Sequence, residues 1–217
     1  MDSYDSIARF YDLENAEFTE DLPFWVDLAR ERGGPVLELG CGSGELLSLL
    51  IRNKDAHVQG IEIDEKAIHE CVAQGLNVFQ QDIDTGLSEY TDHSFDFVIL
   101  SQTMQQVRKL DLVITEALRV GRRVIASFPN FVYYRARFQI FFRGKVPVTP
   151  SLPYTWYDTP NLHFLGISDF VDYCKEREIR IEDRAFIRGN SRVRILPNLL
   201  AETGIFLLSR NYTAPKS

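Results

Sequence analysis

A glycine-rich turn is the first group of residues whose types and spacing could do chemistry. It reads Gly40, Cys41, Gly42, Ser43 and Gly44. Glycine tolerates positive φ and lets backbone N–H groups approach a ligand, because it has no Cβ. The acidic Glu38 precedes the turn, and the glycine spacing differs from the GxGxxG of dinucleotide-binding turns. A carboxylate at this place favours a ligand with positive charge over a pyrophosphate.

Two further acids follow the next two apolar runs. Glu62 closes the run 58–63, where a carboxylate can accept hydrogen bonds from two ribose hydroxyls and disfavours a 2′-phosphate. The structural alternative is a neighbour of a helix N-cap, with Asp64 as the cap. Asp82 follows the third run, where a lone Asp would more often form a turn. Acids after three successive runs are harder to explain that way and favour a cationic nucleoside.

The turn, with Glu38 before it, resembles motif I of class I S-adenosylmethionine (SAM)-dependent methyltransferases. This resemblance implies that the turn lies against the amino-acid portion of SAM and that Glu38 helps to hold its ammonium, directly or through water. It also places Asp82 beside the adenine amino group and Ile83 against the ring. We therefore expect SAM or S-adenosylhomocysteine, and no metal, at a site formed by Tyr11, Glu38, Gly40, Cys41, Gly42, Gly44, Glu62, Ile63, Asp82, Ile83 and Ser101.

A second resemblance narrows the family. Over residues 36–187 the sequence resembles the methionine biosynthesis protein MetW family, in the runs 77–84, 98–103, 119–123, 127–131 and 152–163. The last run is far more specific than the glycine turn, which many unrelated methyltransferases share. The resemblance implies a methyltransferase fold whose members work beside a homoserine O-acyltransferase in methionine biosynthesis, with no established methyl acceptor.

The N-terminal residues depart from that family, whose members typically start closer to the first strand. Tyr4, Asp5, Ala8, Tyr11 and Asp12 form a YDxxAxxYD pattern similar to the N-terminal lid of many small-molecule methyltransferases. In one interpretation SAM is enclosed, with Tyr11 over it. In the other, this region packs as a helix on the edge of the sheet.

The elements that must position these residues alternate between strand and helix. Apolar runs predict strands at 35–39, 58–63, 77–79, 95–100 and 123–128, and helical periodicity predicts helices at 17–32, 45–51, 65–74 and 111–120. Such alternation predicts an α/β class I methyltransferase fold. This is a Rossmann-like, doubly wound, mostly parallel sheet of seven strands with an antiparallel C-terminal strand.

The C-terminal half completes the expected architecture. A helix at 168–177, capped by Ser168, precedes strands at 179–187 and 203–208. The segment 131–166 is expected to be a cap or a partner-binding insertion. It contains an apolar loop at 144–161 with four prolines. We expect one domain over 1–211, with 1–34 as an N-terminal lid or helix and 212–217 as a frayed tail.

Composition limits the classes of function. The net charge of −7 argues against a general nucleic-acid binder. Residues 119–145 carry seven bases and no acid, which predicts a basic patch, either a solvated face or a docking site for an acidic partner or anionic substrate. Three widely spaced cysteines indicate free thiols, and no apolar run is long enough to span a membrane. The N-terminus lacks a signal peptide, so we expect a cytoplasmic protein without a membrane partner.

No catalytic group is evident, but methyl transfer needs a base only if the acceptor must lose a proton. His163 is the best candidate base, although a hydrogen-bonded structural histidine is the more common outcome. Two functions therefore compete. The first is a SAM-binding partner or regulator of a homoserine O-acyltransferase, which we favour because the most specific residues resemble MetW. The second is a SAM-dependent methyltransferase acting on a small-molecule acceptor.

Overall fold

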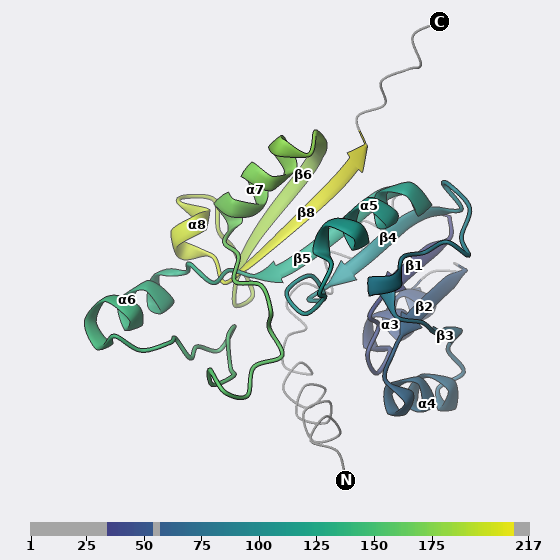
Figure 1. Cartoon of the computed structure of the whole chain (residues 1–217), viewed down its shortest axis with the longest axis horizontal. Helices are drawn as coiled ribbons and strands as arrows, with labels where there is room; N and C mark the ends of the chain where they lie inside the picture. The colour runs from purple at the N-terminus through teal and green to yellow at the C-terminus, as the bar shows by residue number, and fades with distance from the viewer. Residues whose placement is uncertain (1–33, 54–56, 211–217) are drawn as a thin grey trace, which may run out of the picture.

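An eight-stranded sheet with helices on both faces forms the body of the computed structural model, which describes residues 34–53 and 57–210 (Figure 1). Its first half contains β1 (Val36–Leu39), α3 (Glu45–Asn53), β2 (Val58–Glu62), α4 (Glu65–Ala73), β3 (Val78–Gln80), the 3₁₀ turn η1 (Ile83–Thr85) and β4 (Phe95–Ser101). Its second half contains α5 (Leu110–Val120), β5 (Gly121–Pro129), α6 (Tyr134–Arg143), α7 (Ile167–Glu176), β6 (Ile179–Arg188), β7 (Ser191–Arg192), α8 (Pro197–Leu200) and β8 (Thr203–Arg210).

The strands lie in the order β3-β2-β1-β4-β5-β8-β6-β7. The first five are parallel, whereas β8 is antiparallel to both β5 and β6. The predicted fold class is therefore confirmed. The sheet has one strand more than predicted, because β6 ends in a short hairpin with β7 whose turn contains Gly189 at φ +51°. A two-residue strand has no sequence periodicity from which it could be predicted.

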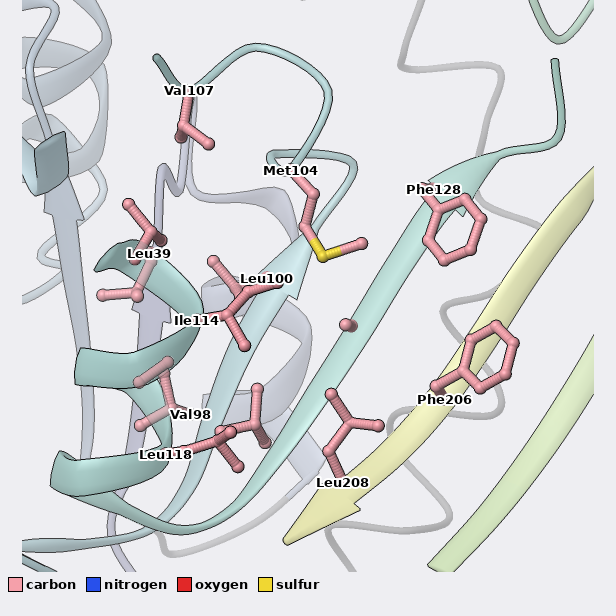
Figure 2. Close-up of a cluster of buried hydrophobic side chains, with 14 of the residues drawn as sticks. Leu39, Val98, Leu100, Met104, Val107, Ile114, Leu118, Phe128, Phe206 and Leu208 are labelled. Atoms are coloured by element: carbon pink, nitrogen blue, oxygen red, sulfur yellow. The ribbon is translucent and has the colours of Figure 1, made fainter. Parts of the chain in front are cut away.

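Alternate residues of the central strands pack on opposite faces of the sheet. On β4, Phe97 and Ile99 contribute to one hydrophobic cluster, while Val98 and Leu100 contribute to the other. Helices α3 and α4 add side chains to the first cluster, and α5 and α7 add theirs to the second. Met104, from the segment after β4, joins the second cluster near Leu100 (Figure 2). Burial on both faces explains why these strands read as continuous apolar runs.

Two helical features differ from the sequence predictions. Helix α6 forms within the segment 131–166, where no helix was predicted. Helix α7 begins one residue early, so the predicted cap at Ser168 is wrong. Its N-cap is Gly166, whose backbone N–H donates to Asp169 Oδ2 at 2.7 Å. Ser168 instead donates its backbone N–H to Asn198 Oδ1.

The basic run 119–145 does not form one patch. Its first three arginines make ion pairs near the start of β5: Arg119 with Asp92 and Glu116, Arg122 with Asp96, and Arg123 with Glu182. The other four bases follow the far end of the same strand, on or just after α6. From Arg123 to the end of β5 at Pro129 the extended strand covers roughly 20 Å, which keeps the two groups apart. Only the second group can therefore form a surface with α6.

Candidate functional site

The point where the strand order reverses lies between β1 and β4. The chain runs outward from β1 to β2 and β3, then crosses back to β4 on the other side of β1. In open α/β sheets a ligand binds at the carboxyl ends of the strands at such a point. The glycine turn follows β1 and Gln102 follows β4, so the topology brings two predicted ligand-binding segments to one edge.

The glycine turn has the backbone geometry that its sequence predicts. Gly40, Gly42 and Gly44 have φ values of +70°, +51° and +78°, a region that side chains with a Cβ rarely adopt. A Cβ on Gly40 would also lie 2.9 Å from Thr103 Cγ2. The turn leads directly into α3, so its glycines serve both the sharp change of chain direction and a close approach to a ligand.

Glu62 stabilises the turn from the end of β2. Its Oε2 atom accepts a hydrogen bond from the backbone N–H of Gly42 at 2.8 Å, and its Oε1 atom accepts from Ile63 and Asp64. The carboxylate thus has a fixed orientation beside the turn. A carboxylate offers about four lone-pair sites, so some capacity remains for a ribose hydroxyl. Asp64 caps α4 through the backbone N–H groups of Lys66 and Ala67, as predicted.

Helix α4 gives the turn a second support that the sequence did not reveal. The Cys71 thiol donates to the carbonyl of Gly42, and Gln74 Nε2 donates to the carbonyl of Ser43 at 3.1 Å. A hydrogen bond with Cys71 raises the pKa of the Cys41 thiol well above its ordinary value, as do burial and the Glu38 carboxylate. Cys41 is therefore a neutral packing residue, which agrees with the prediction of free thiols.

Glu38 is the buried acid of the site, with 3% of its surface exposed. It lies on β1 opposite Gly60 of β2, two residues before Glu62. A buried carboxylate beside the turn, with Glu62 close to it in the sheet, gives this edge a negative potential that favours a cation. Ile63 is exposed next to Glu62, which leaves an apolar side chain available to a flat ring.

Asp82 and Ile83 lie farther along the same edge. Asp82 is exposed and caps η1 by accepting a hydrogen bond from the backbone N–H of Asp84, so it does form a turn. Ile83 is half-buried against the core, so much of its side chain is already in contact with protein. Their adenine contacts remain predictions. Tyr11 lies outside the described residues.

The segment after β4 contains Gln102, which the sequence already places at the ligand-binding end of that strand, and Thr103, which sequence reasoning missed. Gln102 has φ +52°, a strained value for a residue with a side chain, and such strain is common at ligand sites. Thr103 Oγ1 donates to the carbonyl of Leu39 at 3.0 Å and to that of Ser101, which ties β4 to the base of the glycine turn. Both residues fall in a run that resembles MetW, and for Thr103 this was the only signal in the sequence.

His163 joins the segment 131–166 to the residues that follow β4. Its backbone N–H, like that of Leu162, donates to the carbonyl of Gln105. Its Nε2 atom lies 2.9 Å from the carbonyl of Val107, which can only accept, so Nε2 carries the proton. The ring is thus held in a structural hydrogen bond, and Nδ1 is the nitrogen that could act as a base.

Among residues 34–53 and 57–210, no cluster of three or more His, Cys, Asp or Glu side chains could hold a metal ion. In the same part of the chain, no helix has the length and apolar character to cross a membrane.

The sheet order and the glycine turn define the class: the chain has the fold of a class I SAM-dependent methyltransferase. A SAM-dependent methyltransferase from Archaeoglobus fulgidus superposes with a TM-score of 0.64 at 15% identity, covering 93% of this chain and 100% of that one. Another from Thermotoga maritima gives a TM-score of 0.63 at 15% identity, covering 96% of both chains. Identities this low show the fold alone.

The particular family follows from sequence: the chain belongs to the methionine biosynthesis protein MetW family, whose model matches residues 20–208. The match begins earlier than the predicted limit of residue 36, so part of the predicted 17–32 helix belongs to the family. The bifunctional methionine biosynthesis protein MetXA/MetW of Rhodopirellula baltica is 32% identical over 194 residues, which is 82% of this chain and 31% of that protein. The ribosomal protein L11 methyltransferase of Burkholderia thailandensis is 28% identical over 104 residues, 48% of this chain and 34% of that protein. The chain thus spans about a third of the length of these relatives.

Proposed function

We propose that this chain binds SAM at the glycine turn and acts in the cytoplasm as a SAM-responsive partner of a homoserine O-acyltransferase in methionine biosynthesis. One observation carries the partnership: in the Rhodopirellula relative, MetXA and MetW are joined in one protein, and this chain matches about a third of its length. A fusion keeps two activities together at a high effective concentration, which is useful when they interact.

The donor set of the site supports SAM as the ligand. SAM carries an ammonium and a sulfonium, and the site offers the carboxylates of Glu38 and Glu62 beside a turn whose glycines have positive φ. Glu62 would hold the ribose, the glycine turn the amino-acid portion, and Ile63 the adenine. The two carboxylates beside the turn would repel a pyrophosphate. When bound, SAM supplies an electrophilic methyl group, while the residues named here bind and orient it.

SAM is made from methionine, so a SAM-binding partner would report the end product of the pathway to an enzyme that acts early in it. Regulation of this kind requires that SAM changes the affinity or the activity of the complex. It does not require a methyl acceptor.

Transfer of the methyl group to a small molecule is the second candidate function. The observation that favours it is Gln105, which is 3% exposed and follows β4 at the ligand edge. Its Nε2 atom donates to the carbonyl of Gln102, while its Oε1 atom has no hydrogen-bond partner within the described structure. A buried acceptor of this kind could receive a hydrogen bond from a methyl acceptor.

The test is to co-purify this chain with the homoserine O-acyltransferase of its own organism and to measure acyltransferase activity with and without the chain and SAM. We expect a stable complex and a SAM-dependent change in activity. If there is no complex and no effect, the partnership is wrong. Release of S-adenosylhomocysteine in the presence of small-molecule acceptors would support the second function instead, and calorimetry with SAM tests the ligand separately.

A further inference from the structure

We propose that the exposed aromatic face of α6 is the surface on which the acyltransferase docks. This inference rests on the proposed partnership and adds the place of contact. The aromatic face consists of Phe138, Phe141 and Phe142, with Val146 and Val148 just beyond the helix.

The three phenylalanines form one exposed cluster. Their exposed fractions are 57%, 81% and 66% for Phe138, Phe141 and Phe142. The spacing i, i+3, i+4 places them on one side of the helix, and their rings touch, with centroids 4.4 Å apart for Phe138 and Phe142 and 4.8 Å apart for Phe141 and Phe142. Together they expose on the order of 400 Å² of aromatic surface, about the size at which an apolar patch marks an interaction site.

Packing against the described residues buries little of this helix. Ala136 is its one buried residue, and α6 stands away from the sheet (Figure 1). The segment that follows is nevertheless ordered against it, because Gln139 Nε2 donates to the carbonyl of Val148 at 2.8 Å and its Oε1 atom accepts from the same residue. The aromatic face and the two valines are therefore presented together.

The positive charge around the aromatic face indicates which kind of partner can dock there. Arg135 precedes Phe138 by one turn of α6, Arg143 and Lys145 follow Phe142 directly, and the stretch 131–157 contains no acidic residue. In a two-fold dimer through α6, these bases would face their own copies and repel. A partner with apolar side chains inside an acidic rim fits better. In the bifunctional relative, MetXA is joined to MetW in one protein, and MetXA is therefore the kind of partner that we propose for this face.

The position of the face suits a regulator. Helix α6 follows the carboxyl end of β5, at the same edge of the sheet as the glycine turn. A partner docked on α6 would therefore lie near the SAM site without contacting the β2 side of it, where Glu62 is located.

The experiment measures the affinity of full-length variants for the acyltransferase by biolayer interferometry. F141E and F142E place a charge in the centre of the face, and R143E combined with K145E reverses the charges at its rim. The matched control is V72E, an equally charged change at a residue of α4 that is 57% exposed on another part of the molecule. SAM affinity and circular dichroism of each variant show whether it remains folded.

We expect the Kd for the acyltransferase to rise at least about thirtyfold for F141E and F142E, as for central interface residues. R143E with K145E should weaken binding and reduce its dependence on salt, while V72E should bind as wild type does. If wild type binds and F141E and F142E bind equally well, the docking surface is wrong but the partnership stands. If wild type does not bind, the partnership fails and this inference fails with it. A wild-type homodimer that F141E converts to a monomer would show that a second copy is the occupant, and would overturn the proposal.

Discussion

At the scale of single residues, Glu62 is the side chain that joins the turn to the expected ligand. Glu62→Ala removes the acceptor of the Gly42 N–H and, in the proposed site, the acceptor of the ribose hydroxyls. Hydrogen bonds to a charged group contribute about 1.5–3 kcal/mol, so we expect the Kd for SAM to rise roughly 10- to 100-fold. Isothermal titration calorimetry measures this change, and Glu70→Ala, an exposed acid on α4, is the control.

Thermal unfolding of the Glu62→Ala variant without SAM measures the lost support of the turn separately. Equal SAM affinity for Glu62→Ala and wild type would remove the ribose assignment. Equal affinity for Glu70→Ala and wild type is required before any loss at Glu62 can be assigned to the site.

Two glycines separate the cost of positive φ from the cost of a steric clash. Gly40 and Gly75 have φ values of +70° and +76°, but a Cβ would lie 2.9 Å from Thr103 Cγ2 at Gly40 and meets nothing within 4 Å at Gly75. Gly75→Ala should destabilise the fold by about 1–2 kcal/mol. Gly40→Ala should cost about 1–3 kcal/mol more and should also weaken SAM binding.

Urea denaturation of the two alanine variants gives the difference in their free energies of unfolding, and calorimetry gives their SAM affinities. Equal stability of the two variants would mean that Thr103 moves aside freely. A Gly75→Ala variant that also loses SAM affinity would mean that the loss at Gly40 cannot be assigned to the clash with Thr103.

The sequence predicted the conformation of the glycine turn better than the contacts that support it. Alternating glycines and Glu62 could be predicted because local chemistry requires those residue types at that spacing. The support from Cys71 and Gln74 depends on how α4 packs against the turn, and a single side chain on a helix carries no signal of such a contact. Thr103 is another case, since its bond to Leu39 joins residues far apart in the chain.

At the scale of elements, α5 is anchored to the loop before β4 by a charged pair. Glu116 accepts from Arg119 at 2.8 Å and from the backbone N–H of Leu87, while Arg119 also donates to the carbonyls of Leu87 and Tyr90. Hydrogen bonds from Arg119 hold the pKa of Glu116 below its ordinary 4.5. The carboxylate therefore contributes stability above that ordinary value, and the contribution is lost as pH falls through the lower folded-state pKa.

Glu116→Gln should thus destabilise the protein by about 1–3 kcal/mol at pH 7. The difference between wild type and variant should shrink as the pH falls below 4.5, because wild-type Glu116 then becomes protonated. Urea denaturation at pH 7, 5 and 3.5 measures this trend. A difference that stays constant over this range would mean that the charge of Glu116 does not stabilise the fold.

Helices and strands could be predicted where burial of a face gives the sequence a regular pattern of apolar residues. Strands β4 and β5 and helix α5 were predicted within two residues, since both faces of the strands and one face of the helix are buried. Helix α6 was missed because its apolar residues face outward and it has no side-chain N-cap. The α7 cap was misplaced because Gly166 uses Asp169 of the first turn, and this bond leaves Ser168 without a capping role.

At the scale of the whole molecule, one chain of contacts links the proposed docking face to the ligand edge. The segment after α6 returns to the core at His163, whose ring is bonded to Val107 and whose backbone N–H donates to Gln105. Thr103, two residues before Gln105, is bonded to Leu39 at the base of the glycine turn. A partner that shifts this segment would therefore act on residues beside the proposed SAM site.

Thermodynamic linkage between SAM binding and acyltransferase binding gives a quantity that can be measured. If SAM changes the affinity for the acyltransferase by some factor, the acyltransferase must change the affinity for SAM by the same factor, which is about 5- to 150-fold in most such systems.

His163→Ala removes the ring contact with Val107 but keeps both backbone hydrogen bonds to Gln105. We expect each affinity measured alone to stay within about twofold and the coupling factor to fall toward one. Calorimetry with SAM, with and without saturating acyltransferase, measures that factor, and His69→Ala on α4 is the matched control. A factor unchanged by His163→Ala would exclude this route and leave His163 as a candidate base, whereas loss of SAM affinity alone would assign the residue to the ligand site itself.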